Sequence, residues 1–263
     1  MLKRLVILVL LGLPFAASAD TAPPTCTDHF LGVEMPNVSP NRARKTRFLC
    51  FSEYAVLHSA LTKTPVWSAE RLTSERIEAA AGVPRKNAFH AEQRLAPNER
   101  AELADYKESG FDRGHMAPAG DMSTPKAKRE SFSLANMIPQ HPCNNEELWE
   151  GIESAVRQLV VDEDEVYVVT GPVYPSSAEL KQIGDGVIIP THVFKAIYVP
   201  TINGAAAYVT PNTDGKEWKG ISLNDLNKLI DVDIFPKLPQ SVKNTAMKLP
   251  DPLPPKFRCR LRN

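Results

Sequence analysis

The pattern of apolar and polar positions predicts a chain built mainly of short strands. Apolar and β-branched runs predict a strand over 47–58 and its hairpin partner over 65–72. A buried strand is predicted over 165–170, ended by Gly171-Pro172, with more strands over 187–189, 192–199 and 205–210. Strands that follow one another in this way, with few helices between them, favour an α+β fold with a mainly antiparallel sheet.

Helical periodicity is clearest over 145–161. Its apolar residues recur on one side, and Glu146, Glu147 and Glu150 fall on the other. The pair Asn144-Asn145 stands where an N-cap is expected, and the two glutamates after it suit the positive end of the helix dipole. Shorter helices are predicted around 97–104 and over 222–230, the second capped by Ser222, while the rest of 73–109 is predicted as loop.

The first 19 residues have the composition of a secretory signal peptide. A short basic start is followed by an apolar run over 5–15 and by Ala17-Ser18-Ala19, which predicts cleavage after Ala19 and a secreted or periplasmic protein. Asp20 does not support a lipoprotein anchor at this site, although an uncleaved anchor stays open. We expect residues 20–263 to form one domain, with an irregular arm over 20–45 and a proline-rich tail over 236–263. No later segment is apolar enough to cross a bilayer, so no membrane contact is expected after cleavage.

The net charge helps to distinguish a nucleic-acid-binding protein from an enzyme. Cleavage removes Lys3 and Arg4, which leaves 31 − 2 = 29 basic against 31 acidic residues and a net charge of −2. This is not the basic balance of a protein that coats nucleic acid. An enzyme needs only a local positive cleft, so the balance counts against a binding module more than against an enzyme.

Four cysteines are present, at 26, 50, 143 and 259. In an exported protein an even count predicts two disulfides, for which three pairings exist. We favour Cys26–Cys50, which would tie the arm to the first strand, and Cys143–Cys259, which would hold the tail beside the central helix. The spacings contain no cluster typical of zinc. Free buried thiols are the alternative.

The candidate chemistry begins at Asp112-Arg113-Gly114-His115. Histidine accepts a proton near neutral pH, because its unperturbed pKa is about 6.5. The glycine allows the backbone to bend or another group to approach closely. The guanidinium of Arg113 presents a planar set of donors that suits phosphate oxygens. A structural role for His115 is the alternative.

Asn145 and Glu153 are a candidate cation pair on the predicted helix. They are eight positions apart, roughly 12 Å along the axis and about 80° around it, and the side chain of Glu153 leans back toward Asn145. Both cannot easily bind one ion directly, but one can be a ligand while the other holds the ion's water. Mg²⁺ favours such an arrangement because it sheds water reluctantly.

Taken together, these residues and Asn136 resemble the DNA/RNA non-specific endonucleases of the ββα-metal (His-Me finger) superfamily. The resemblance spans roughly 45–235 and has several ordered motifs with the expected gaps. It implies a central antiparallel sheet with helices on both sides, and a metal finger made by the strand of His115 and the helix of Asn145. The supporting motifs are Pro84-Arg85 with Phe89, Asp105-Tyr106, Met116-Ala117-Pro118, Asn136-Met137 with Pro139-Gln140, and Val169-Thr170-Gly171-Pro172.

The resemblance also implies roles for single residues. His115 is expected to be the general base, a neutral imidazole oriented by a backbone carbonyl, and Arg85 to contact the scissile phosphate. Without the resemblance, a surface salt bridge would explain Arg85 equally well. Asn145 is expected to bind Mg²⁺, with Mn²⁺ or another divalent cation as alternatives, and Glu153 to hold the ion's water. Asn136 would support the site through hydrogen bonds, with the ion's water among its candidate partners, while Asp112 and Arg113 would brace the loop or touch the substrate.

The function implied is hydrolysis of DNA and RNA with little sequence preference, leaving 5′-phosphate ends. Two other classes stay open, namely a metal-dependent phosphodiesterase with a different substrate and a catalytically silent nucleic-acid-binding protein. The sequence leaves open the preference among single-stranded DNA, duplex DNA and RNA. A monomer, a homodimer and an inhibitor protein are also all compatible with it.

Overall fold

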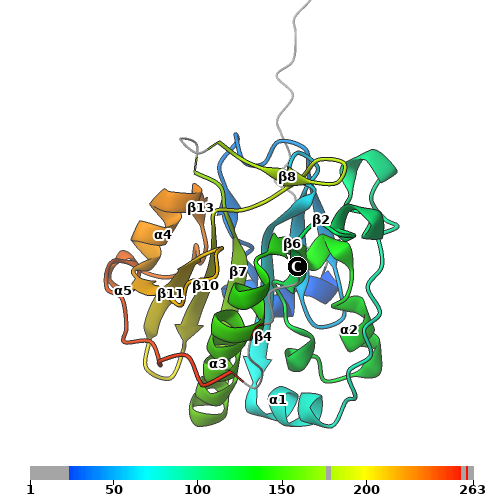
Figure 1. Ribbon diagram of the computed structural model, residues 1–263. Helices are drawn as coiled ribbons and strands as arrows, with labels where there is room; N and C mark the ends of the chain where they lie inside the picture. The colour runs from blue at the N-terminus through cyan, green and yellow to red at the C-terminus, as the bar shows by residue number, and fades with distance from the viewer. Residues whose placement is uncertain (1–23, 176–178, 256–258, 260–263) are drawn as a thin grey trace, which may run out of the picture.

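A seven-stranded antiparallel sheet is the centre of the molecule, in a computed structural model that describes residues 24–175, 179–255 and 259 (Figure 1). The predicted signal peptide, residues 1–19, lies outside the described residues. All neighbouring strands pair antiparallel, which confirms the α+β prediction. In spatial order the strands are β12 (Lys219–Ile221), β11 (Gly204–Pro211), β10 (His192–Val199), β7 (Glu165–Val173), β4 (Thr64–Thr73), β3 (Ala55–Ser59) and β2 (Thr46–Cys50).

In the described part of the chain, three two-stranded ribbons accompany this sheet. One of them, β5 (Asp112–His115) with β6 (Met137–Gln140), carries the histidine of the candidate site. The other two are β1 (Asn37–Val38) with β13 (Val232–Asp233), and β8 (Gln182–Ile183) with β9 (Val187–Ile188). The segment 20–45, expected to be irregular, therefore contributes a short strand and two 3₁₀ helices, Pro24–His29 and Leu31–Val33.

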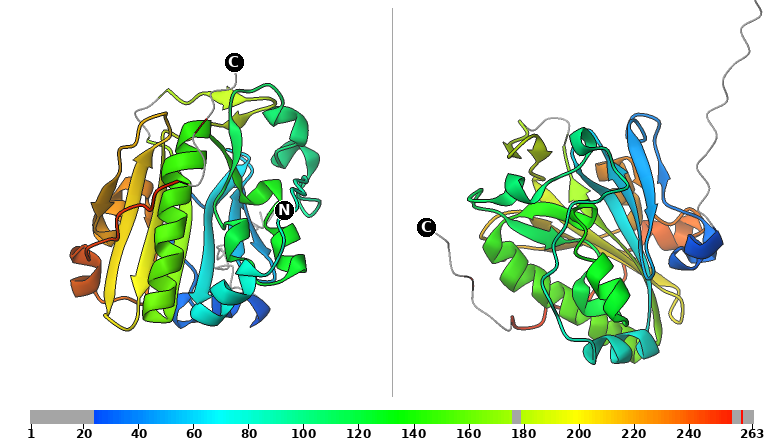
Figure 2. Two further views of the ribbon diagram at one scale, coloured as in Figure 1. Left: turned by 60° about the horizontal axis from the view of Figure 1, so that its bottom comes forward. Right: turned by 90° about the vertical axis from the view of Figure 1, so that its right-hand side faces the viewer.

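Helices cover both faces of the sheet, as the edge-on view shows (Figure 2). On one face lie α1 (Ser74–Ala81), α2 (Pro125–Glu130) and α3 (Glu150–Glu163). On the other lie α4 (Leu223–Ile230) and α5 (Gln240–Asn244), with the first 3₁₀ helix. Further 3₁₀ helices are Pro97–Glu99, Leu103–Tyr106, Ala119–Asp121 and Leu134–Asn136. Among the residues described, no helix combines the length and apolar character needed to cross a bilayer.

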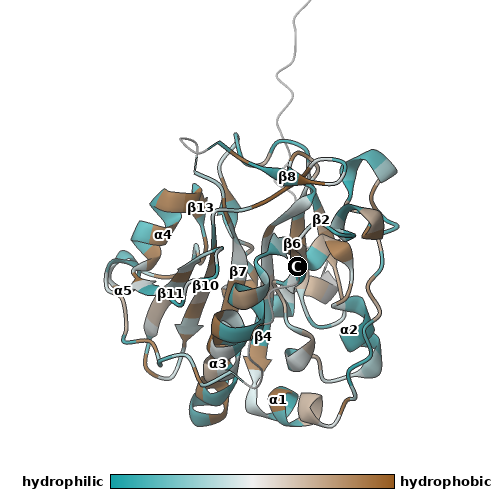
Figure 3. Cartoon of the chain, in the orientation of Figure 1, coloured by the Kyte–Doolittle hydropathy of each residue, from teal (hydrophilic) through white to brown (hydrophobic). Residues whose placement is uncertain are grey.

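Each face of the sheet has its own apolar core, because side chains alternate along a strand. In β10, Val193 and Ile197 pack with α3, whereas Phe194 and Ala196 pack with α4. Both helices accordingly carry apolar and polar residues side by side (Figure 3). The α3 face is the one on which the candidate site is built.

Several predicted elements are confirmed. The strands over 192–199 and 205–210 pair with each other, and the helix over 222–230 forms with Ser222 as its cap, accepting a hydrogen bond from the backbone nitrogen of Asp225 at 3.1 Å. Both favoured disulfides are present, Cys26–Cys50 and Cys143–Cys259, with Cα–Cα distances of 5.9 and 4.8 Å.

Other predictions are wrong, and each has a local cause. The strand over 47–58 is two strands, because the chain turns at 51–54 and folds back on itself. Strand β7 does not end at Gly171-Pro172 but continues to Val173, with Pro172 opposite Val193. The helix around 97–104 is two short 3₁₀ helices, and α1 lies in a segment that was predicted as loop.

Candidate active site

The ribbon β5–β6 and the helix that follows it form one compact finger. Asp112 lies opposite Gln140 and His115 opposite Met137 in the antiparallel register. Met116, directly after His115, is buried against Leu148, Trp149 and Ile152 of the helix. A Cβ on Gly114 would collide with the side chain of Gln140. Gly114 is therefore required for close approach of a neighbouring group, one of the two explanations that the sequence offered.

The helix begins before the asparagine pair, so the N-cap prediction is wrong. A π-helical segment, Asn144–Trp149, precedes α3, and the backbone nitrogen of Asn145 donates to the carbonyl of His141 at 2.9 Å, a bond of the helical type. Asn144 is fully buried and accepts from Gln140 Nε2 at 2.6 Å. Its own Nδ2 donates to Thr210 Oγ1 and to the carbonyl of Pro211. Asn144 thus fixes the start of the helix to both β6 and the sheet.

Asn145 is held by the strand of the histidine. Its Nδ2 donates to Asp112 Oδ2 at 3.0 Å, and within the described chain its Oδ1 accepts no hydrogen bond. The amide is therefore oriented with its oxygen available. A carbonyl oxygen is a suitable ligand for a hard cation such as Mg²⁺.

Glu153 lies on the next turns of the same helix and is partly buried. Its carboxylate has no hydrogen-bond partner among the residues described. Burial raises the pKa of Glu153 to about 7, against the opposing charges of Lys195 and Arg157. In the described part of the chain no three His, Cys, Asp or Glu residues come together as a metal site. One amide oxygen and one carboxylate therefore fit a cation that keeps most of its water.

His115 is almost buried, with 8% of its surface exposed. Its ring packs edge-to-face on Phe132, with centroids 5.0 Å apart, and lies 5.7 Å from Phe89. Its Nε2 has no hydrogen-bond partner within the described residues, and the orientation of the ring by a backbone carbonyl stays a prediction. Burial, together with the charges of Arg85 and Arg113, lowers the pKa of His115 to about 3. The imidazole is therefore neutral at neutral pH.

Two guanidinium groups flank this imidazole. Arg85 Cζ lies 5.5 Å from the ring centroid of Phe132, and Arg113 Cζ lies 4.1 Å from that of Phe89. Arg85 is exposed and donates to Asn87 Oδ1 at 3.1 Å. Within the described chain neither arginine pairs with a carboxylate, so the surface salt bridge considered for Arg85 is not formed. Both cations are available to an anion at His115.

Asn136 is fully buried and braces the segment after His115. Its Nδ2 donates to the carbonyls of Ala117 and Ser131 at 2.8 and 3.0 Å. Its Oδ1 accepts from Ala117 N and Ser68 Oγ at 3.0 and 2.9 Å. Nδ2 and Oδ1 of Asn136 therefore both bond to other protein groups, in agreement with the expected support through hydrogen bonds. Neither atom remains to bond the ion's water, which was the other partner suggested.

The sequence did not reveal a set of charged side chains buried behind α3. Arg157 Nη1 donates to Asp121 Oδ1 at 3.0 Å, and Lys195 Nζ donates to Thr170 Oγ1 at 2.8 Å. Glu70 is also buried, with its carboxyl group within hydrogen-bond reach of Asp121. Burial raises the pKa of Glu70 well above its usual value, and the nearby charge of Asp121 raises it further. The sequence feature that could have indicated these buried charges is a charged residue within an apolar strand, as at Glu70 and Lys195.

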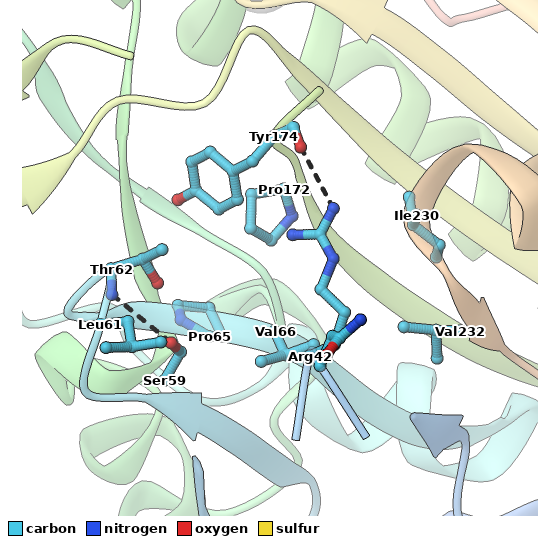
Figure 4. Close-up of a pocket in the computed structure, with 11 residues that line it drawn as sticks. Arg42, Ser59, Leu61, Thr62, Pro65, Val66, Pro172, Tyr174, Ile230 and Val232 are labelled. Atoms are coloured by element: carbon cyan, nitrogen blue, oxygen red, sulfur yellow. Dashed lines mark hydrogen bonds between the residues drawn. The ribbon is translucent and has the colours of Figure 1, made fainter. Parts of the chain in front are cut away.

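A separate pocket of about 170 Å³ lies away from these residues, beside Pro65, Pro172 and Tyr174 (Figure 4). The guanidinium of Arg42 crosses it and donates to the carbonyl of Tyr174 at 3.1 Å. None of its lining residues is a histidine or a carboxylate. The pocket therefore has no side chain suited to acid–base catalysis, whereas the finger has His115.

Comparison with known proteins agrees with this geometry. The sequence model of the DNA/RNA non-specific endonuclease family matches residues 34–241. Nuclease C1 of Cunninghamella echinulata var. echinulata is 33% identical over 219 residues, which cover 76% of this chain and 86% of that protein. Human mitochondrial Endonuclease G is 31% identical over 191 residues, covering 68% of this chain and 62% of the relative. The solved structure of the EndoG/EndoGI complex superimposes with a TM-score of 0.66 at 26% identity, over 76% of this chain and 89% of that one.

Proposed function

Since the chain belongs to the DNA/RNA non-specific endonuclease family and is an endonuclease, we propose that it hydrolyses both DNA and RNA, with one hydrated Mg²⁺ as cofactor and little sequence preference. Mn²⁺ or another divalent cation is the alternative. The observation that carries this proposal is the surroundings of His115. A neutral imidazole lies within the electrostatic influence of two arginines, and within the described residues neither arginine has a carboxylate partner. Such a site is suited to a phosphate.

The roles of the side chains follow from their positions. Asn145 Oδ1 would hold the cation and Glu153 would accept hydrogen bonds from its hydration shell, and the bound cation supplies positive charge to the phosphate. His115 accepts the proton of the attacking water at a ring nitrogen. The water oxygen bonds to phosphorus as the bond to the 3′ oxygen breaks. The 3′ oxygen takes up a proton from solvent and leaves as a hydroxyl, and the phosphate stays on the 5′ side of the other fragment. Arg85 and Arg113 bind the phosphoryl oxygens, where negative charge develops.

The low pKa of His115 is compatible with its role as a base. Burial and the two arginine charges keep the imidazole neutral, so it can accept a proton. A substrate phosphate between Arg85 and Arg113 would offset their positive charge. The pKa of His115 then rises in the complex, and the imidazole becomes a stronger base when substrate is present.

We also propose that the enzyme acts outside the cytoplasm, as a secreted or periplasmic protein. The N-terminal segment has the composition of a signal peptide. Two disulfides support the proposal, since disulfides persist in oxidising compartments. The similar EndoG was solved in complex with EndoGI, in a structure that describes the mechanism of EndoG inhibition. An inhibitor protein is therefore a partner to search for here.

The test uses the purified mature chain with supercoiled plasmid and with RNA, in Mg²⁺ and in EDTA. We expect both substrates to be degraded in Mg²⁺ only, with 5′-phosphate ends. Plasmid and RNA that stay intact, while a small synthetic phosphodiester is cleaved, would favour the phosphodiesterase alternative. His115→Ala should retain substrate binding and lose about 10²–10⁴-fold in rate. Binding without cleavage by the wild type would favour a silent binder.

A further inference from the structure

A C-terminal segment crosses from the sheet to the start of the helix that carries Asn145. We call residues 249–255 together with Cys259 the strap. Leu249 is buried in the core between the sheet and α3, and Tyr208 Oη of β11 donates to the carbonyl of Pro250 at 2.7 Å. Leu253 N then donates to the carbonyl of Gly151 at 3.0 Å. The strap therefore lies across α3, as Figure 2 shows for its red segment.

The far end of the strap is bonded covalently beside the candidate ligand. Cys259 forms a disulfide with Cys143, two residues before Asn145. The backbone nitrogen of Cys259 also donates to Glu147 Oε1 at 2.7 Å, two residues after Asn145. No side chain caps the π-helical segment at Cys143. The strap is thus bonded to the start of the helix on both sides of Asn145, at Cys143 and at Glu147.

Gly151 shows that the helix is adapted to the strap. A Cβ at this position would lie 2.5 Å from the carbonyl oxygen of Leu253 and 3.3 Å from Pro252 Cβ. In a helix interior glycine is otherwise disfavoured relative to alanine. The close approach of the strap backbone is the physical reason for glycine here.

We infer, on the basis of the proposed function, that the strap is a positioning element of the cation site. Its two attachments, at Cys143 and Gly151, bracket Asn145 and hold the first turns of the helix against β5. Asn145 can orient its oxygen only while Nδ2 reaches Asp112 at 3.0 Å, so a helix start that shifts loses this bond. The strap therefore determines cation affinity without contacting the cation.

Two variants release the strap at different points. Gly151→Ala prevents the close contact of the strap backbone at Leu253 with the helix and leaves the disulfide intact. The double variant Cys143→Ser with Cys259→Ser removes the disulfide that holds the end of the strap. The matched control is Cys26→Ser with Cys50→Ser, which removes the disulfide between the first 3₁₀ helix and β2. Circular dichroism checks that each variant is folded. Mg²⁺ and Mn²⁺ affinity is measured by calorimetry without substrate, and amide hydrogen exchange is measured over 144–149.

We expect both strap variants to bind the cation about 10-fold more weakly or worse, with faster exchange over 144–149. The control should match the wild type in both respects. Wild-type affinity in both strap variants overturns the inference, and so does equal weakening in the control, which would indicate a global effect. If the wild type binds no divalent cation, the proposed function fails. Whether the strap holds the start of the helix is then decided by amide hydrogen exchange alone. Unchanged exchange over 144–149 in Gly151→Ala rejects that claim.

Discussion

Asn145 donates from Nδ2 to Oδ2 of Asp112 at 3.0 Å, and this contact joins the helix of the finger to the strand that ends in His115. The bond has a chemical consequence besides a structural one. An amide that donates through nitrogen to a fixed carboxylate has its oxygen fixed as well. We therefore expect Asp112 to orient the candidate ligand, a bracing role that is one of the two expected of it.

Asp112→Ala tests this relationship. Without its acceptor the Asn145 amide is free to rotate, so we expect the affinity for Mg²⁺ to fall about 10- to 100-fold, as for other partners that orient metal ligands. Calorimetry on the folded protein measures it. The control is Asp162→Ala, which removes a similar amide-to-carboxylate bond, from Gln158 at 2.9 Å, on the exposed side of α3. If the two variants bind the cation equally well, Asp112 does not orient Asn145.

Much of the fold and of the finger could be predicted because the signals are local. A buried strand shows as a short, mostly apolar run within its own residues, as in β10, and Ser222 caps a helix within three positions. Likewise Asp112 to His115 is a short spacing on one strand, and Asn145 to Glu153 is a short spacing along one continuous run of helix. These predictions needed no knowledge of what packs against them.

The rest depends on contacts between distant segments. Asn144 and Asn145 look like a cap in the sequence, but Asn144 is inside the helix because Thr210 and Pro211 of the sheet accept its hydrogen bonds. No periodicity indicates that Phe132 packs on His115, or that Asp121 pairs with Arg157 across 36 positions. Tertiary packing decides such positions.

Phe132→Leu tests whether aromatic packing positions the base. The smaller side chain lets water reach His115, so burial lowers its pKa less and the pKa moves up toward 6.5. We expect the acid limb of the pH–rate profile to move to higher pH. Because the imidazole also loses its fixed orientation, kcat should fall about 10- to 100-fold.

The control for this change is Phe194→Leu, which makes the same replacement in the core on the other face of the sheet. It should lower stability and leave the pH–rate profile in place. Identical profiles in the wild type and in Phe132→Leu would show that the aromatic ring does not set the pKa of the base.

Glu70→Gln tests the charge state of the buried carboxyl behind α3. Burial and the charge of Asp121 raise the pKa of Glu70 well above its usual value, so the folded protein keeps a proton that the unfolded chain loses above about pH 4.5. The unfolded state therefore binds fewer protons between these two pKa values, and stability falls as the pH rises through that window. Glutamine is neutral in both states and removes this cost.

We expect the Tm of Glu70→Gln to exceed that of the wild type at pH 8, and the difference to shrink toward pH 4, with about 2–4 °C for each kcal/mol. Glu92→Gln is the control of opposite sign. Burial by itself would raise the pKa of Glu92, but hydrogen bonds from Arg94 and Ser133 lower it, so glutamine there should reduce the Tm at pH 8. A lower Tm for Glu70→Gln at pH 8 would instead mean that Glu70 is ionised and stabilised by Arg76 and Lys195.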